Sequence, residues 1–379
     1  MRREIIIPSK EAQKLVEKLK NGTSADEKRM VRFLEMPDLS RTPGSPIAEM
    51  VRRILALSDY KDFDVIEVPE IAPADISFDL FDFPADHPAR SGSDTYYADE
   101  KHILRTHTTV MWYYYLQDEE IKKRMTAGES VGCFSFGKVY RKDEIDRHHM
   151  NVFHQIDGWY LTPKDKKILT TEDLKHVLAS IAKAIFGNQV ELRFNPDKFP
   201  YTDPSLEMEI KKRDSWLEML GSGVVKGSVL EKFGVDSTKW NGWAFGTGLE
   251  RYAMISMSLP DIRLLWSTDP RVTDQLELGT PFKDVSKYPQ ITRDISFVVP
   301  KTFVPNHYFD LIRDLGGDLV EEVKLLDTYQ DKKKFGDKIS YTYRVIYRSH
   351  ERTLTYKEVD TIQKNIYEQT AKQFGAEIR

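Results

Sequence analysis

Apolar residues recur at helical spacing near the N-terminus, and each apolar segment follows a residue that can cap a helix. Ser9 precedes the first predicted helix, and Asn21 marks its end. Ser24 and Glu27 have the spacing of a capping box, which predicts a second helix. A third begins after Ser45, where a proline follows at the first helical position. The first two helices fall within residues 1–40, which are therefore predicted to form a helical extension.

Alternation of polar and apolar residues replaces the helical pattern from residue 131 to residue 160. A period of two predicts strands, and further short strands are predicted at 190–194, 207–210 and 216–220. Residues 171–186 have one apolar face at helical spacing and are predicted to form a helix. Successive strands with few helices between them predict an α+β fold, in which an antiparallel sheet is flanked by helices.

A boundary is predicted near residues 279–281, where glycine, threonine and proline follow one another. The elements predicted after it are a strand (294–299), a helix (306–315), a strand (320–329), a loop (331–337), a strand (340–347), a helix (355–374) and a short strand (376–379). The order βαββαβ is that of a ferredoxin-like domain. The sequence thus predicts a helical extension (1–40), a main domain (41–279) and a C-terminal ferredoxin-like domain (280–379).

Composition restricts the class of protein further. Of the 379 residues, 40% are hydrophobic and 31% are charged, which is typical of a folded globular chain. No run of 18 apolar residues predicts a membrane-spanning helix, and the single cysteine excludes an internal disulfide. The 56 basic and 60 acidic residues give a net charge of −4, so no general basic field attracts nucleic acid. Binding of RNA at a few phosphates stays possible.

The segment GKVYRKDEIDRHHMNVFHQIDGWY predicts a strand, a loop and a second strand. In the second strand, Phe153, Gln155, Asp157 and Trp159 share one face. This mixture suits a pocket that stacks a ring and hydrogen-bonds a cation, although it also fits an exposed edge strand. Arg141, at the end of the first strand, has the planar guanidinium that binds phosphate through two parallel bonds, but it also suits an ordinary surface position.

A second candidate for ligand binding is the segment WAFGTGLERYAMISM. Gly246 and Gly248 allow close backbone approach, either to a ligand or in a simple packing turn. The helix predicted to follow places Arg251 in its first turn, where the helix dipole disfavours a cation. An anionic partner such as a phosphate would offset that cost.

These pieces together resemble the three signature motifs of class II aminoacyl-tRNA synthetases. The helix after Ser45 with the extended segment through Pro69 resembles motif 1, the strand-loop-strand with Arg141 resembles motif 2, and GTGLER resembles motif 3. The segments DHPARSGSDTYY, ILRTHTT, VFHQIDG, FPYTDPSLEMEI, WLEMLGSGV, WAFGTGLER and LPDIRLLW resemble phenylalanyl-tRNA synthetase. The resemblance runs from about Ser40 to the C-terminus and is to the single-chain, mitochondrial-type form, whose ferredoxin-like domain binds the anticodon.

The resemblance implies a reaction in which phenylalanine and ATP form phenylalanyl-adenylate, whose acyl group then moves to the 3′ end of tRNA(Phe). It implies contact of Arg141 with the α-phosphate and of Arg251 with the γ-phosphate. Phe153 would stack on adenine, with His149 and Asp143 beside the nucleotide. Magnesium ions would bridge the phosphates, and their protein ligands stay unassigned.

The resemblance also implies binding sites for the amino acid and for tRNA. The residues that it implies for phenylalanine are His107, Thr109, Gln155, Ile156, Asp157, Gly158, Phe199, Tyr201, Ala244 and Phe245, and Glu218 is a candidate for metal or substrate contact. The predicted tRNA phosphate contacts are Lys283, Lys287, Arg293, Arg344, Arg348 and Arg352. Four positions depart from the family pattern: Asp143 and Asp157 replace glutamate, Thr109 replaces serine, and Tyr201 replaces phenylalanine.

Three further expectations accompany this interpretation. No segment resembles the editing domain of the two-subunit enzyme, and the fused anticodon domain favours a monomer. Without a recognisable leader sequence, a cytoplasmic location is expected, with the mitochondrial matrix as the alternative. The competing functions are a class II ligase for another amino acid, such as O-phosphoserine, and a tRNA-binding paralogue without catalysis. Aromatic residues in the expected pocket disfavour the first, and the presence of both Arg141 and Arg251 disfavours the second.

Overall fold

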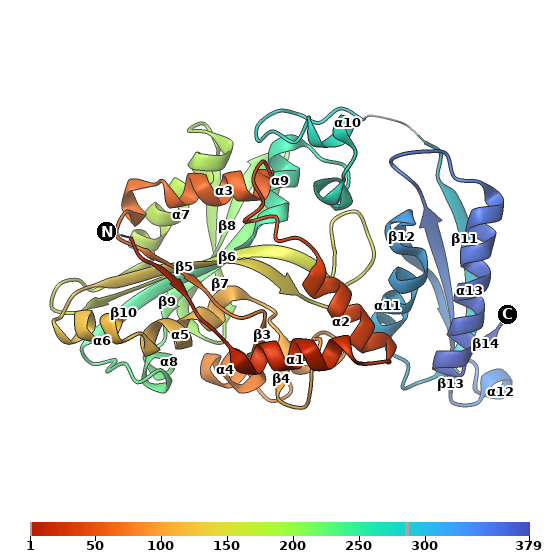
Figure 1. The fold of residues 1–379 in the computed structure, drawn as a ribbon, viewed down its shortest axis with the longest axis horizontal. Coiled ribbons are helices and arrows are strands. Elements are labelled where there is room, and N and C mark those ends of the chain that lie inside the picture. Colours follow the sequence, from red (N-terminus) through yellow and green to blue (C-terminus); the bar gives the residue numbers. More distant parts are fainter. Residues whose placement is uncertain (1, 285–287) are drawn as a thin grey trace. The chain divides into compact units, whose positions relative to one another are not determined.

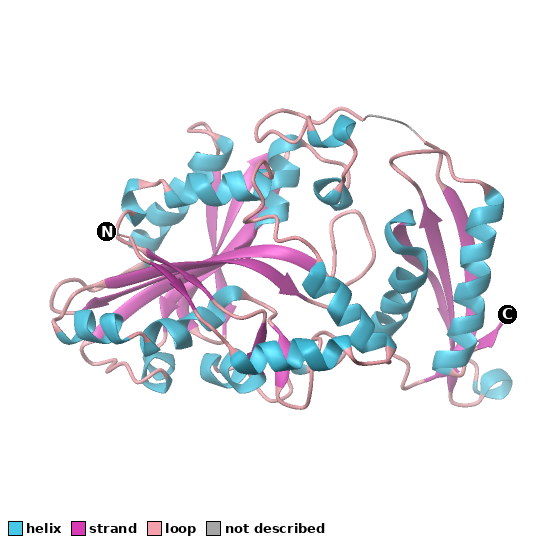
Figure 2. Cartoon of the chain, viewed as in Figure 1, coloured by secondary structure: helices cyan, strands magenta, loops and turns pink. Residues whose placement is uncertain are grey.

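The computed structural model describes residues 2–284 and 288–379, and the chain divides into two compact units (Figures 1 and 2). Unit 1 comprises Met1–Tyr140, Val152–Ser258 and Glu277–Pro281, and unit 2 comprises Arg141–Asn151, Leu259–Leu276 and Phe282–Arg379. The loop of the predicted strand-loop-strand therefore belongs to a different unit from its two strands. The domain ranges predicted from the sequence remain proposals.

Unit 1 is built on an eight-stranded sheet with the order β1-β2-β5-β6-β10-β9-β8-β7. The strands are β1 (Glu4–Ile6), β2 (Asp64–Glu67), β5 (Val131–Tyr140), β6 (Val152–Pro163), β7 (Leu192–Phe199), β8 (Thr202–Lys212), β9 (Ser215–Val225) and β10 (Trp240–Gly248). From β5 to β7 all neighbours are antiparallel, which confirms the predicted type of sheet, whereas β1–β2 and β2–β5 are parallel. A separate two-stranded sheet pairs β3 (Ile71–Pro73) with β4 (His102–Leu104).

Strand β1 was not predicted from the sequence, because its three residues, Glu-Ile-Ile, are too few to show alternation of polar and apolar positions. Its position depends on long-range contacts instead. The Arg2 guanidinium donates hydrogen bonds to the backbone carbonyls of Leu55, Tyr60 and Phe63 at 2.7 to 2.9 Å. The N-terminal residues therefore belong to the sheet of unit 1.

The predicted N-terminal helices form with the expected caps. They are α1 (Lys10–Lys20), α2 (Ala25–Glu35) and α3 (Pro46–Leu55), and the predicted later helix is α7 (Thr171–Phe186). Ser24 and Glu27 form the capping box, with side chain-to-backbone bonds of 2.9 and 3.2 Å. The other helices of unit 1 are α4 (Ala74–Phe78), α5 (Met111–Gln117), α6 (Glu119–Thr126), α8 (Gly227–Lys232) and α9 (Leu249–Met257).

The two faces of the sheet have separate cores. Figure 1 shows α3, α7 and α9 over one face and α5, α6 and α8 over the other. On the first face, Phe63, Phe134 and Phe245 form part of a chain of packed aromatic rings. On the second, Trp112 and Trp159 stack with ring centroids 4.6 Å apart. Both faces of the central strands are therefore covered by packed side chains.

Unit 2 contains the predicted ferredoxin-like order. Its sheet, β12-β13-β11-β14, is formed by β11 (Ile291–Pro300), β12 (Val320–Tyr329), β13 (Lys338–Tyr347) and β14 (Glu377–Ile378), with helices α11 (Pro305–Gly316) and α13 (Tyr356–Phe374). The short helix α12 (Lys332–Phe335) lies in the predicted loop, and α10 (Pro270–Thr273) precedes this sheet in the chain. Ile145, from the segment 141–151, is 5% exposed and packs in the hydrophobic core of this unit.

A buried polar cluster joins α5, α6 and β2 in unit 1. The Asp64 carboxylate, 1% exposed, accepts hydrogen bonds from the Tyr115 hydroxyl at 2.7 Å and from the Arg124 guanidinium at 3.0 Å. Burial raises the pKa of Tyr115 well above its ordinary value, so its hydroxyl stays protonated and donates.

We expect Tyr115→Phe to lower the free energy of unfolding by about 2 kcal/mol, because a hydrogen bond to a buried carboxylate is lost. Urea unfolding monitored by circular dichroism measures the change. Tyr113→Phe is the control on the same helix, since no hydrogen bond of the Tyr113 hydroxyl is seen in the described part of the chain. Equal stability of the two variants would contradict the assignment.

Candidate active site

Strands β6 and β10 position the candidate site through their pairing register. Asp157 lies opposite Gly246, and Gln155 lies opposite Gly248. Side chains directly opposite each other in a sheet point to the same face. Gln155 and Asp157 therefore project over the two glycines, where no side chain of β10 competes for space.

Gln155, Asp157 and Thr109 form a hydrogen-bonded group on this face. The Gln155 side-chain amide donates to one Asp157 oxygen at 2.9 Å, and the Thr109 hydroxyl donates to the other at 2.5 Å. Asp157 is 1% exposed, and Gln155 Oε1 is buried without a hydrogen-bond partner among the described residues. A buried carboxylate beside an unused amide oxygen suits a cationic ligand such as an ammonium group.

Glycines make room on this face for side chains of neighbouring strands. A Cβ atom at Gly246 would lie 2.5 Å from Asp157 Oδ1, and one at Gly221 would lie 2.5 Å from the Phe199 ring. Gly246 and Gly221 are themselves paired across β10 and β9. The Phe199 ring and the Asp157 carboxylate thus occupy neighbouring positions on one face of the sheet.

Aromatic rings surround Tyr201, which the sequence placed in the phenylalanine site. Its ring centroid is 6.1 Å from that of Phe199 and also 6.1 Å from that of Phe83, while Phe81 is at 5.8 Å. His107 contacts both Phe81 and Phe83. Neither Phe81 nor Phe83 was predicted from the sequence to belong to the site. Their segment is broken by prolines and shows no periodicity, and the only available signal was the local richness in aromatic residues.

The remaining predicted phenylalanine-site residues divide between the two faces of the sheet. Ala244 is opposite Trp159 and belongs to the core that includes Trp112, on the face of Asp157. Phe245 is opposite Gly158, and its ring would be 2.5 Å from a Cβ atom at that glycine, so its side chain points to the other face. Ile156, two residues earlier than Gly158, is fully buried on that other face. The structure does not bring the side chains of Phe245 and Ile156 together with Asp157.

Arg251 lies in the first turn of α9, as predicted, and is exposed. Its guanidinium donates one hydrogen bond to the backbone carbonyl of Glu218 at 2.9 Å. The Glu218 side chain is also exposed. The half-buried Phe153 ring lies 3.8 Å from where a Cβ atom of Gly248 would be, on the face of Gln155. These residues stand where β6, β9 and β10 meet the start of α9.

The predicted nucleotide residues of the segment 141–151 are held within unit 2. The Arg141 backbone N–H donates to the Asn151 carbonyl at 3.0 Å, and the Asn151 amide donates to the Arg141 carbonyl at 3.2 Å. The Asp143 carbonyl accepts a bond of 2.7 Å from Arg313 of α11. The segment is therefore tied to α11 by backbone contacts.

His149 is paired with Asp146 in the same segment, with 2.8 Å between His149 Nδ1 and the carboxylate. Burial raises the pKa of Asp146, but hydrogen bonds from His149 and from the backbone N–H groups of His148 and His149 outweigh it and lower the pKa below its ordinary value. Asp146 is consequently an anion at neutral pH, and it orients the His149 ring.

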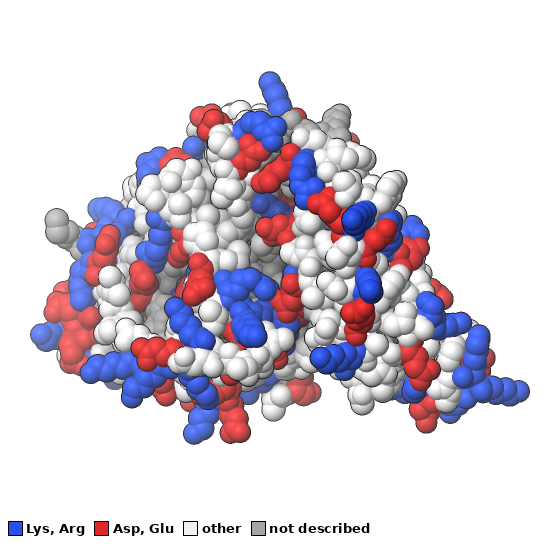
Figure 3. Space-filling model, turned by 45° about the vertical axis from the view of Figure 1, so that its right-hand side comes forward, with Lys and Arg blue, Asp and Glu red and all other residues white. Residues whose placement is uncertain are grey.

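Most of the predicted tRNA contacts in unit 2 take part in ion pairs. These are Arg293 with Asp360, Arg344 with Asp294, Arg348 with Glu321 and Arg352 with Glu358, each at 2.7 Å. The Lys283 backbone N–H donates to the Gln275 side chain at 3.0 Å, and Lys287 lies outside the described residues. The face in Figure 3 carries basic and acidic side chains intermixed rather than one field of a single sign.

No helix in the described residues is long and apolar enough to cross a membrane. In the same part of the chain, no group of three or more histidine, cysteine, aspartate and glutamate side chains is arranged to hold a metal ion.

Comparison with known proteins identifies the class. The family model "tRNA synthetases class II core domain (F)" matches residues 34–276, and the model "Ferredoxin-fold anticodon binding domain" matches residues 286–379. The fold and both models define a class II aminoacyl-tRNA synthetase with an appended anticodon-binding domain.

The relatives identify the amino acid. The chain is 41% identical to the chloroplastic/mitochondrial phenylalanine–tRNA ligase of Arabidopsis thaliana, over 80% of this chain and 70% of the relative. It is 35% identical to the mitochondrial phenylalanine–tRNA ligase of Mus musculus (83% and 74%) and 33% identical to that of Saccharomyces cerevisiae (80% and 80%). The chain belongs to the phenylalanine–tRNA ligase family, so it activates L-phenylalanine with ATP and transfers it to tRNA.

We expect Gly246→Ala to raise KM for phenylalanine at least ~10-fold, because its Cβ atom must displace the Asp157 carboxylate. ATP–pyrophosphate exchange at varied phenylalanine measures the effect. Gly248→Ala is the matched control on the same strand, since its Cβ atom would make only an ordinary contact of 3.8 Å with Phe153. If both variants retain the KM for phenylalanine of the unmodified enzyme, the amino acid does not bind beside Gly246.

Proposed function

We propose that Gln155, Asp157 and Thr109 bind the ammonium group of phenylalanine. The hydrogen-bonded arrangement of these three residues is the main observation that supports the proposed site. The buried carboxylate gives the cation a charged partner, and the unpartnered Gln155 oxygen gives it a further acceptor. The ring of the substrate then extends toward Phe199, Tyr201 and the aromatic residues around them, where edge-to-face contacts fix its orientation. His107 and Ala244 complete the proposed pocket.

For ATP, we propose Arg251 as the ligand of the γ-phosphate and Arg141 as the ligand of the α-phosphate, with Phe153 stacked on adenine and Asp143 and His149 beside the nucleotide. Arg251 is exposed at a helix start, where it would gain most from an anion. Attack of the phenylalanine carboxylate on the α-phosphorus expels pyrophosphate, and negative charge builds on the phosphate oxygens. Arginine stabilises that charge through fixed, paired donors.

Magnesium fits this site as a substrate-bound ion. Such ions are held mainly by phosphates and water with one or two carboxylates, so they do not require a cluster of protein ligands. The exposed carboxylate of Glu218, on the residue whose carbonyl binds Arg251, is the proposed protein ligand. The ion would neutralise phosphate charge when bound, while Arg251 orients the same phosphates.

For tRNA, we propose that unit 2 binds the anticodon region through Lys283, Lys287, Arg293, Arg344, Arg348 and Arg352. Of its ion-paired arginines, Arg352 is exposed, and Arg293, Arg344 and Arg348 are half-buried. Phosphates can compete for those whose carboxylate partners also reach the surface, such as Arg344 and Arg352. Lys332, Lys333 and Lys334 on α12 add three exposed charges that have no ion pair in the described part of the chain. The single-chain arrangement of the two matched domains favours a working monomer.

The location that we propose is the mitochondrial matrix, the alternative of the sequence analysis. Relatives that match most of this chain are named mitochondrial or chloroplastic/mitochondrial enzymes. No relative among these supports the first expectation, a cytoplasmic enzyme.

We expect Arg251→Ala and Arg141→Ala each to lower the rate of ATP–pyrophosphate exchange at least ~10²-fold, because each removes a donor from the transition-state charge. Binding of tRNA should stay largely intact. Arg193→Ala is the control, because it also removes an exposed arginine of unit 1 but one that is not a proposed ligand contact. Arg193, on β7, forms an ion pair with Glu209 of the neighbouring strand β8. Near-normal exchange in Arg251→Ala or Arg141→Ala would disprove the assignment of that arginine.

We expect measurable activation of tyrosine, since an apolar pocket rejects an added hydroxyl by only about 10²-fold. Tyr201→Phe should improve the ratio of kcat/KM for phenylalanine over tyrosine by less than about tenfold, because the phenol can bond the hydroxyl of a bound tyrosine. Ala244→Gly should instead admit larger para substituents. An unchanged or lower ratio in Tyr201→Phe would mean that the phenol faces away from the ligand.

A further inference from the structure

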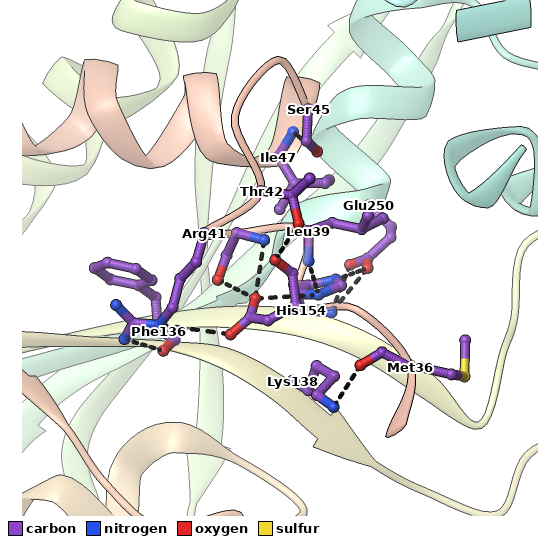
Figure 4. Close-up of polar contacts among 12 residues, drawn as sticks. Met36, Leu39, Arg41, Thr42, Ser45, Ile47, Phe136, Lys138, His154 and Glu250 are labelled. Atoms are coloured by element: carbon purple, nitrogen blue, oxygen red, sulfur yellow. Dashed lines mark hydrogen bonds and ion pairs between the residues drawn. The ribbon is translucent and has the colours of Figure 1, made fainter. Parts of the chain in front are cut away.

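The connection between α2 and α3, residues 36–45, is fastened to β5 and β6 by buried and half-buried polar groups (Figure 4). The Lys138 ammonium, on a residue 3% exposed, donates hydrogen bonds of 2.7 Å to the backbone carbonyls of Leu34 and Met36. The Arg41 guanidinium lies 4.4 Å from the centre of the Phe136 ring. This connection therefore has a fixed path across the sheet.

His154 links this connection to α9. Its ring is fully buried, and Nε2 accepts a hydrogen bond of 2.9 Å from the backbone N–H of Leu39. Because Nε2 accepts, Nδ1 carries the proton and donates to the Glu250 carboxylate at 2.6 Å. Asp38 also approaches Nε2, at 3.4 Å. The imidazole thus bridges one backbone N–H and one carboxylate, each on a different element.

Glu250 is fixed by more than the imidazole. The backbone N–H of His154 also lies 2.8 and 2.9 Å from the two oxygens of its carboxylate. Glu250 is 3% exposed and stands in the first turn of α9, where the helix dipole stabilises an anion. A carboxylate bonded from both the backbone and the ring of one residue leaves the first turn of α9 little freedom to move relative to β6.

The residues next to His154 and Glu250 in the sequence are proposed ligand contacts. Arg251 follows Glu250, and Phe153 and Gln155 flank His154 with side chains on the opposite face of β6. A shift at His154 or Glu250 would therefore move the γ-phosphate ligand relative to the adenine and ammonium contacts.

We infer that the hydrogen bonds between His154 and Glu250 position Arg251 for the activation step, with His154 and Glu250 as positioning residues that do not touch the substrates. The inference rests on the proposed role of Arg251. Catalysis by charge stabilisation requires donors that are already in place, and a displacement of about 1 Å can cost 10²-fold in rate. The backbone N–H of Leu39 supports this arrangement, because it keeps the proton of the imidazole on Nδ1.

Two substitutions at His154 separate its two hydrogen bonds. In His154→Asn, the side-chain amide ends near the position of Nδ1, so it can donate to Glu250 but does not reach Leu39. In His154→Gln, the amide ends near the position of Nε2. Its oxygen can accept the Leu39 N–H, but the donor that His154 Nδ1 offers to Glu250 is lost. We expect His154→Gln to lower kcat of ATP–pyrophosphate exchange at least ~10-fold and to raise KM for ATP, with little change in KM for phenylalanine. His154→Asn should keep most of kcat.

Glu250→Gln is the second test, since it preserves shape but replaces one acceptor by a donor facing the His154 N–H. It should reproduce the kinetic pattern of His154→Gln. Tyr115→Phe is the matched control, because it removes a hydrogen bond from a different buried carboxylate, that of Asp64. It should lower Tm without changing the kinetics of exchange. Melting temperatures of all variants accompany the kinetics.

The outcomes separate the inference from the proposed function. Loss of exchange in Arg251→Ala together with normal kinetics in His154→Gln and Glu250→Gln would overturn the inference alone. Equal losses in His154→Asn and His154→Gln would also overturn it, as would a loss in Tyr115→Phe as large as theirs. Normal exchange in Arg251→Ala would instead overturn the proposed function.

Discussion

The antiparallel pairing of β6 with β10 is the constraint on which the rest of unit 1 depends. Because side chains alternate between faces, one register places Asp157 over Gly246 and His154 toward the opposite face. A slip of one residue would move the carboxylate into the aromatic core of Phe134 and Phe245, and would move His154 away from Glu250. The same pairing therefore builds the proposed ligand face and fastens the helix that carries Arg251.

Burial of charge on both faces is possible because each charged group has several donors. Asp157 is bonded by a hydroxyl and an amide, and Glu250 by a backbone N–H and an imidazole. A buried carboxylate without such donors would be strongly disfavoured. The two groups differ in what is left over: Gln155 Oε1 keeps an unused acceptor beside Asp157, which suits a site that must receive a cationic ligand and release the product.

Local sequence patterns were sufficient to predict elements whose ends depend on nearby residues. They were insufficient where an element or a contact depends on residues far apart in the sequence. Ser24 with Glu27 gave the start of α2, and the apolar periodicity gave both ends of α7. Strand β7 was predicted too short, because its outer residues are held by pairing with β8 rather than by an apolar pattern. The polar face of β6 was recognised, but the hydrogen bonds of the strand join residues far apart: Asp157 and Thr109 are 48 positions apart, and His154 and Glu250 are 96 apart, which periodicity cannot reveal.

The ion pairs of unit 2 are compatible with its proposed use as an RNA-binding surface. Arg344 and Arg352 are fully paired with carboxylates of the same unit, so a phosphate must compete with Asp294 and Glu358. Exposed pairs of this kind contribute only about 0–1 kcal/mol each, so their exchange for a phosphate costs little. In the absence of RNA, the pairs hold long side chains in extended positions, which lowers the entropy lost on binding. If unit 2 binds RNA as proposed, the contribution of these arginines is selective. It favours an RNA whose phosphates match their positions, in a protein whose net charge of −4 gives no general attraction.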